Sequence, residues 1–172
     1  MSSGDTIFIL DPLTSQPPAS LAAGLGRIID ASTPNAVVPV LKFDPTTAWW
    51  AYWFFQVPSH YAGGGFTWSW KGGTDNTSVG TLELELGIIK ISDATILTGD
   101  LGMDASTRTG ISDTPPATPQ DKLNYSGTGT ISHANAGSPS VGDLVGLAVT
   151  RDVAADTNTG ILQLAKLLIL ET

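Results

Sequence analysis

Residues 81–88 read Thr-Leu-Glu-Leu-Glu-Leu-Gly-Ile, so an apolar side chain alternates with a polar one along this stretch. Successive side chains of a β-strand point to opposite faces of a sheet, and the alternation therefore predicts a strand buried on one face and solvated on the other. We expect the strand to continue through Ile91, with Gly87 marking a bulge or a bend. Similar alternation recurs in residues 66–70 and 145–149, whereas residues 49–57 and 161–170 are almost wholly apolar.

These stretches predict an all-β fold. Nineteen glycines and eleven prolines supply turns between short strands. Residues 37–43 and 123–132 read as further strands, and no convincing helix separates any of them. Seven or eight strands in series favour a jelly roll or β-sandwich of about eight antiparallel strands over a parallel α/β sheet. We assign this sandwich domain to residues 37–172.

Residues 1–36 are expected to form an extended N-terminal arm, because prolines at positions 12, 17, 18 and 34 interrupt any long regular element there. The only regular element expected within the arm is a short helix from Ser20 to Ile29. A partly apolar arm that cannot build its own core should lie against this domain or a neighbour. Further along, residues 99–121 are rich in Thr, Ser, Asp and Pro and are expected to be a long irregular connection.

Composition excludes several classes of function. The net charge is −8, and the eight Lys and Arg residues are scattered, which argues against a nucleic-acid groove. The chain has no cysteine, which removes disulfides and thiolate metal sites. No apolar run approaches the roughly 20 residues that cross a bilayer, and the first residues lack the features of a signal peptide. We therefore expect a soluble protein made without export. Charged residues are only 14% of the chain, which predicts either a polar uncharged surface or surface hidden against partner chains.

No catalytic, cofactor or metal site emerges from the sequence, and we do not expect an enzyme. His60 and His133 have no spacing typical of metal ligands, and no nucleophile signature is present. Glu83 and Glu85 share one strand face and could serve as paired carboxylates in glycoside hydrolysis, but a solvated strand face explains them more simply. The acidic loops at residues 75–77 and 152–158 lack the spaced ligands of a calcium-binding loop.

Aromatic residues gather in one part of the chain, because all five tryptophans fall within residues 49–70. On the strand over residues 49–57 both faces are aromatic: Trp49, Trp53 and Phe55 share one face, and Trp50, Tyr52 and Phe54 share the other. A strand of a solvated sandwich should have one polar face, so something must cover the second one. Three covers are open: a partner subunit, the N-terminal arm, or a sugar chain stacked on the rings as in carbohydrate-binding modules. The interface residues expected on this argument are Ile7, Phe8, Ile9, Leu10, Trp49, Trp50, Tyr52 and Trp53.

Two stretches also resemble a known family. Residues 54–64 read Phe-Phe-Gln-Val-Pro-Ser-His-Tyr-Ala-Gly-Gly, an aromatic strand that ends in a turn and is followed by a second strand at Trp68. Residues 142–152 read Gly-Asp-Leu-Val-Gly-Leu-Ala-Val-Thr-Arg-Asp and precede an apolar C-terminal strand. Over residues 37–172 the pattern is similar to jelly-roll virion proteins of tailed phages, which include head decoration (cement) proteins and head-fibre domains.

The resemblance implies a structural protein with no active site to carry over. It implies a capsid decoration protein that stabilises the phage head by binding the lattice of major capsid protein. Such a protein would be a homotrimer on the outer surface of the virion, made in the host cytoplasm. The alternative is a carbohydrate- or receptor-binding β-sandwich module, either a fibre domain or a carbohydrate-binding module. A third interpretation is a small hydrolase that uses Glu83 and Glu85.

Overall fold

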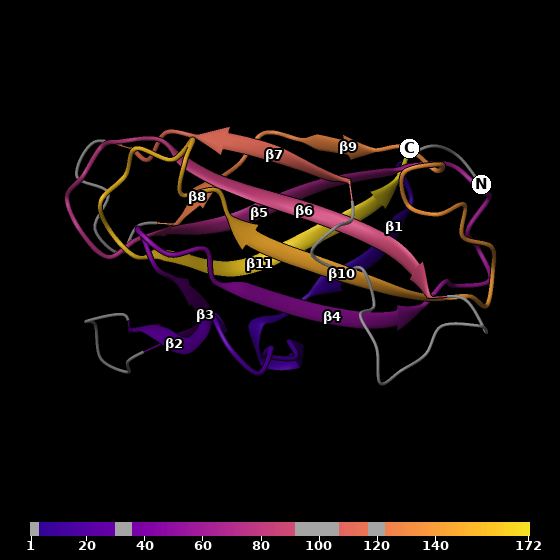
Figure 1. Ribbon diagram of the computed structural model, residues 1–172, viewed down its shortest axis with the longest axis horizontal. Coiled ribbons are helices and arrows are strands. Elements are labelled where there is room, and N and C mark those ends of the chain that lie inside the picture. Colours follow the sequence, from indigo (N-terminus) through magenta and orange to yellow (C-terminus); the bar gives the residue numbers. More distant parts are fainter. Residues whose placement is uncertain (1–3, 30–35, 92–106, 117–122) are drawn as a thin grey trace.

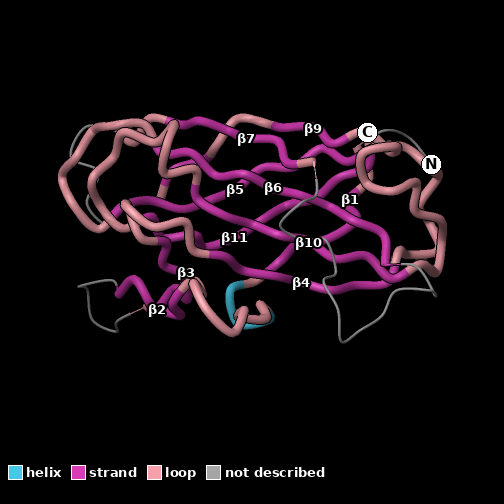
Figure 2. Tube along the Cα trace, in the orientation of Figure 1, coloured by secondary structure: helices cyan, strands magenta, loops and turns pink. Residues whose placement is uncertain are grey.

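A computed structural model describes residues 4–29, 36–91, 107–116 and 123–172, which form two antiparallel sheets packed face to face (Figure 1). The fold is all-β, as the sequence predicts. Within the described residues the only helical element is a 3-10 turn, η1, at Pro12–Thr14 (Figure 2). The strands are β1 (Thr6–Leu10), β2 (Gly24–Ile29), β3 (Val37–Phe43), β4 (Trp50–Gln56), β5 (Phe66–Thr74), β6 (Leu82–Ile91), β7 (Arg108–Asp113), β8 (Asn124–Tyr125), β9 (Gly129–Ile131), β10 (Leu144–Arg151) and β11 (Leu162–Glu171).

The two sheets differ in size. The larger has seven strands in the order β2-β3-β11-β5-β8, with β1 paired to β11 and β9 paired to β5. The smaller has four strands in the order β4-β10-β6-β7. The core between them contains Phe43, Phe66, Trp68 and Trp70 from the larger sheet, packed against apolar side chains of β6 and β10. Because these residues all point inward, alternate residues of the same strands form the two outer faces.

Strand β6 confirms the alternation that decides the fold, since its leucines are buried and its glutamates are half-buried. The expected bulge at Gly87 is wrong. The register of β6 runs unbroken past this residue, with Gly87 opposite Ala148 of β10 and Arg108 of β7. Gly87 therefore sits in regular strand geometry, where its lack of a side chain shapes the outer face of the sheet rather than the path of the backbone.

The expected irregular connection at residues 99–121 is wrong in part, because β7 lies within it. Only Ile111 of this strand is buried, so its sequence shows no run of alternating apolar residues. Pairing with β6 makes it a strand: Ile111 lies opposite Leu84 and Arg108 lies opposite Gly87. Residues 99–106 and 117–121 of the expected connection lie outside the described residues.

The N-terminal segment supplies two strands of the larger sheet. β1 pairs with the second half of β11, and β2 pairs with β3. The helix expected from Ser20 to Ile29 is wrong, because Gly24 and Gly26 disfavour a helix and the hairpin partner β3 offers cross-strand contacts in its place. Residues 30–35 of the expected arm lie outside the described residues.

Candidate functional site

The outer face of the four-stranded sheet carries three aromatic side chains of β4. Ala51 and Trp53 point into the core, so Trp50, Tyr52 and Phe54 point to solvent. The sequence predicts this division of the aromatic residues between two faces. Trp50 and Tyr52 are half-buried, and Phe54 is exposed.

Strand register brings charged residues of β6 and β7 to the same face. Tyr52 lies opposite Ala148, which in turn lies opposite Gly87, which lies opposite Arg108. One row further along, Trp50, Thr150, Glu85 and Gly110 are aligned in the same way. We call the set Trp50, Tyr52, Phe54, Glu85 and Arg108 the aromatic face.

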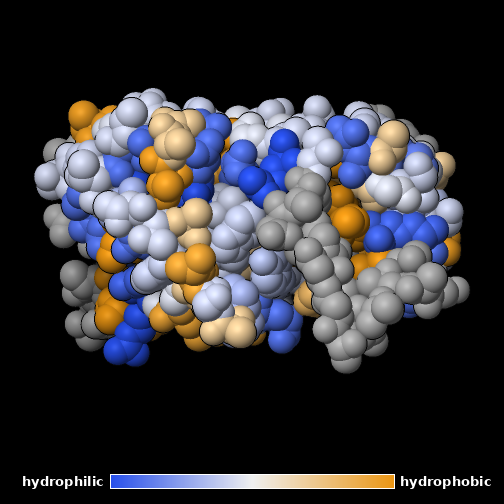
Figure 3. Space-filling model, viewed as in Figure 1, coloured by the Kyte–Doolittle hydropathy of each residue, from blue (hydrophilic) through white to orange (hydrophobic). Residues whose placement is uncertain are grey.

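The middle of this face is a floor of small residues. Gly146 and Ala148 of β10 and Gly87 of β6 point outward and have no side-chain atom beyond Cβ. All three are buried beneath neighbouring side chains. Figure 3 views this side of the molecule, where residues of intermediate hydropathy form much of the described surface in the middle. Larger side chains can therefore lie flat across β10 and β6.

Trp50 and Arg108 meet above that floor. Their backbones are three strand spacings apart, or about 14 Å, yet the Arg108 guanidinium carbon lies 5.1 Å from the centroid of the Trp50 ring. Both side chains must therefore extend toward each other over β10 and β6. The Arg108 Nε donates to the Glu85 carboxylate at 2.9 Å, which fixes the guanidinium in place. The Tyr52 ring adjoins Trp50, with 6.3 Å between the centroids.

The N-terminal segment pairs with the free edge of β4 and does not lie over its outer face in the described residues. The Gln16 amide donates to the Tyr52 carbonyl at 2.7 Å, and the Trp50 amide donates to the Leu21 carbonyl at 2.7 Å. These bonds satisfy a strand edge that would otherwise be open. They also fix the backbone from which the Trp50 and Tyr52 rings project.

Of the three covers left open by the sequence, the N-terminal residues 7–10 are not the one, because they do not lie on the aromatic face. Ile7 and Leu10 are buried in the core, because β1 adds to the edge of β11 in the opposite sheet. Phe8 packs on Phe55 from the core side, with 3.6 Å between the ring centroids. Ile9 is 62% exposed, on the outer face of the larger sheet.

The other expected interface residues also lie in different parts of the structure. Trp53 is 3% exposed, and its indole Nε1 donates to the Asp11 carbonyl at 3.2 Å. Trp49 packs against the core from the end of β4. Of the eight residues, only Trp50 and Tyr52 come together on the aromatic face. Sequence reasoning missed Arg108 as their neighbour, because only the register of β7 against β6 reveals it.

The acidic residues weighed for catalysis and metal binding are held by structural partners. Glu83 accepts a hydrogen bond from the Ser112 hydroxyl, and Glu85 pairs with Arg108. Asp75 accepts the Ile161 amide at 2.8 Å. In the part of the chain that the structure describes, no cluster of His, Asp and Glu could hold a metal ion. The same residues include no helix long and apolar enough to cross a membrane.

The two histidines lie near the end of the sandwich where residues 4–6 meet the C-terminal strand. The Nε2 of His60 is 3.2 Å from the Thr6 carbonyl, and the Nδ1 of His133 is 3.0 Å from the Tyr61 hydroxyl. The buried Glu171 carboxylate accepts hydrogen bonds from the Ala62 amide at 2.8 Å and from the Gly64 amide at 2.9 Å. This cluster closes the turn between β4 and β5 against the C-terminus.

The Tyr61 hydroxyl gives this cluster a pH dependence. Burial raises the pKa of Tyr61 to about 12, and the negative charge of Glu171 adds to the rise. The pKa of a tyrosine in an unfolded chain is about 10, so the folded state binds this proton more tightly. The resulting stabilisation is complete below about pH 10 and is lost as the pH rises through about 12.

We therefore expect the free energy of unfolding to fall over this interval, and to fall less steeply in Tyr61→Phe. Denaturant titrations at a series of alkaline pH values measure both slopes. Tyr125→Phe removes the hydroxyl of a 63% exposed tyrosine, so it is the control and should keep the parent slope. Identical slopes in Tyr61→Phe and the parent would contradict the assignment.

Comparisons with known proteins show the fold alone. No family model and no curated protein matches the chain. A solved structure of Clostridium thermocellum endo-1,4-beta-D-xylanase 10B, containing CBM22-1-GH10 modules complexed with xylohexaose, is 9% identical over 100% of this chain, with a TM-score of 0.50. This chain spans 29% of the length of that one.

Two further structures are similar at lower scores. The CBM22-1 xylan-binding domain of Paenibacillus barcinonensis Xyn10C is 11% identical over 99% of this chain and 97% of that one, with a TM-score of 0.44. The enzymatically active domain of bacteriophage CBA120 tailspike protein 4 is 12% identical over 99% of this chain and 21% of that one, with a TM-score of 0.39.

Proposed function

We propose that this domain is a non-catalytic carbohydrate-binding module, and that its aromatic face binds a polysaccharide chain. The observation that carries the proposal is the arrangement of Trp50 and Tyr52, two adjoining rings that project from β4 beside a floor of Gly and Ala. These side chains lie over the buried floor, and their half-buried rings offer the apolar surface on which the carbon–hydrogen faces of a sugar chain can stack.

The polar groups at the rim complete the chemistry. Binding sites for small molecules and saccharides combine aromatic surface with a few placed polar groups that fix orientation. Here Glu85 supplies acceptor oxygens and Arg108 supplies donors, and their mutual ion pair accompanies the guanidinium that lies over the Trp50 ring. Sugar hydroxyls both donate and accept, so this pair suits a neutral glycan. The chain shares its fold with a part, 29%, of the xylanase chain that contains a CBM22-1 module, which supports the proposal at the level of architecture only.

Affinity electrophoresis through gels containing xylan, mannan, galactan or β-glucan tests the proposal directly. We expect at least one polysaccharide to retard the protein, and Trp50→Ala to weaken binding at least about tenfold, or about 1.4 kcal/mol. Trp50 is outside the core, so the variant should melt within a few degrees of the parent. Tyr125→Ala is the control, because it removes an exposed ring from the opposite sheet.

Two outcomes would contradict carbohydrate binding. One is the absence of retardation by every polysaccharide, and the other is equal retardation of the parent and Trp50→Ala. The same samples separate this proposal from capsid decoration, in which the protein would be a homotrimer on a phage head. A trimer by light scattering that binds purified major capsid protein and no glycan would favour decoration.

A further inference from the structure

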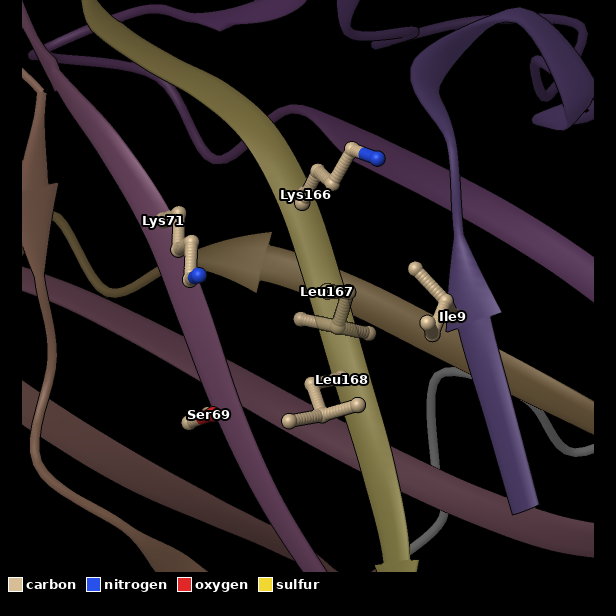
Figure 4. A pocket seen from close by; sticks show the side chains of 6 residues that line it. All are labelled: Ile9, Ser69, Lys71, Lys166, Leu167 and Leu168. Carbon is tan, nitrogen blue, oxygen red and sulfur yellow. The ribbon is translucent and has the colours of Figure 1, made fainter. Parts of the chain in front are cut away.

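A hollow lies on the outer face of the seven-stranded sheet, on the side of the sandwich opposite the aromatic face (Figure 4). Its volume is about 230 Å³. Figure 4 shows β11 running between β5 and β1, with Leu168 between Ser69 and Ile9. The lining residues are Ile9 of β1, Ser69 and Lys71 of β5, and Lys166, Leu167 and Leu168 of β11.

Two lysines stand directly opposite each other at one end of this hollow. Lys166 pairs with Lys71 in the register of β11 and β5, and both side chains are exposed on the same face. Like charges directly opposite on neighbouring strands are destabilising. The chain carries only eight Lys and Arg residues against sixteen Asp and Glu, so two cations in register are unusual for it.

The two ammonium groups are not neutralised within the described residues. The ion pairs found there involve Lys90, Arg108 and Arg151, and neither lysine of the hollow takes part. Lys71 lies over the ring of Tyr125, with its Nζ 4.6 Å from the centroid, which limits where this charge can move. Figure 4 shows the Lys166 ammonium group pointing away from Lys71. Both side chains are exposed, so an anion placed between them would gain attraction from both once the Lys166 side chain turns toward it.

Apart from Ser69, the rest of the hollow is apolar. Ile9 is largely exposed, Leu168 is half-buried on the outer face, and Leu167 closes the floor. No aromatic ring lines this hollow, unlike the aromatic face. A ligand that fills it must offer a negative group at one end and aliphatic surface at the other.

We infer that this hollow is a second binding site, which takes a carboxylate carried on an aliphatic body. The carboxylate lies between Lys71 and Lys166, and the aliphatic part covers Leu168 and Ile9. This inference is independent of carbohydrate binding, because the hollow and the aromatic face lie on different sheets.

Isothermal titration with octanoate tests the inference. Acetate supplies the same charge without the aliphatic body, and octanamide supplies the same body without the charge. We expect octanoate to bind at least tenfold more tightly than either. Lys166→Glu should weaken octanoate binding at least tenfold without lowering the melting temperature, because the introduced carboxylate would face Lys71 as an opposite charge. Arg27→Glu makes the same change in net charge at an exposed site on β2 and should bind octanoate as the parent does.

Three results would overturn the inference: octanoate binding that is unchanged in Lys166→Glu, acetate binding as tight as octanoate, or binding of oligogalacturonate in preference to octanoate. The last would make the hollow a site for acidic sugars. Trp50→Ala should keep full octanoate affinity, so failure of carbohydrate binding and failure of this site are distinguishable.

Discussion

Replacing Arg151 by methionine is expected to destabilise the domain by about 3–5 kcal/mol, because the change leaves a buried carboxylate without its partner. Arg151 is fully buried at the end of β10. Its guanidinium forms a bidentate pair with Asp156, with both nitrogen–oxygen distances at 2.8 Å. The Asp156 side chain is also almost fully buried, so water cannot replace the lost donors.

The same guanidinium also forms hydrogen bonds with backbone carbonyl groups. It donates to the Gly160 carbonyl at 2.6 Å and to the Asn158 carbonyl at 2.5 Å. This one side chain therefore contributes several of the bonds that anchor the loop between β10 and β11. A buried ion pair is weak evidence of net stability, but breaking it from one side is costly.

Urea unfolding of purified variants measures the effect. Arg27→Met removes an exposed arginine from β2 and should shift the free energy of unfolding by no more than about 0.5 kcal/mol. The double variant Arg151→Met, Asp156→Leu leaves no unpaired buried charge and should recover part of the loss. An Arg151→Met protein as stable as the parent would mean that Asp156 finds another partner or reaches water.

The strand pattern was predictable wherever burial alternates along the chain. Residues 82–91 and 144–151 have leucine or valine at every second position over much of their length, and both form strands. The two faces of β4 were also predictable, because alternation alone separates Trp50 from Trp53. The neighbours that cover or support those two faces were not predictable, because they depend on which distant strands pair with β4.

Two wrong predictions, those for β7 and Gly87, show what the local sequence pattern cannot reveal. β7 buries one apolar side chain, so nothing in its sequence distinguishes it from a polar loop until β6 lies beside it. Gly87 resembles a bulge residue in sequence, yet its role follows from its register with Ala148 and Arg108. The candidate site is made of such cross-strand rows, and register is a non-local property that local pattern does not encode.

The aromatic face therefore depends on how β7 is held, and the core residue Trp68 holds it. Trp68 lies on β5 in the larger sheet and is 1% exposed. Its indole Nε1 crosses the sandwich to donate to the Thr109 hydroxyl of β7 at 3.0 Å. Strand β9 passes so close that a Cβ on Gly129 would lie 2.6 Å from this nitrogen, which explains why glycine stands there.

Trp68→Ala is expected to cost about 3–5 kcal/mol, because removing a fully buried ring leaves a cavity that the sheets fill only in part. It should also weaken the proposed glycan binding at temperatures where the fold persists, since β7 carries Arg108 next to Thr109. Calorimetric unfolding and affinity electrophoresis of the same sample measure the two effects.

A matched pair of conservative variants separates the hydrogen bond from the packing. Trp68→Phe leaves Thr109 without its donor, whereas the Nε1 of Trp70 has no partner among the described residues, and Trp70→Phe removes an unsatisfied group. We expect Trp68→Phe to cost about 1 kcal/mol more than Trp70→Phe. Equal costs would mean that the bond to Thr109 contributes nothing to the junction of the sheets. The position of Arg108 would then follow from β6 pairing alone, and Trp68→Phe would leave glycan affinity unchanged.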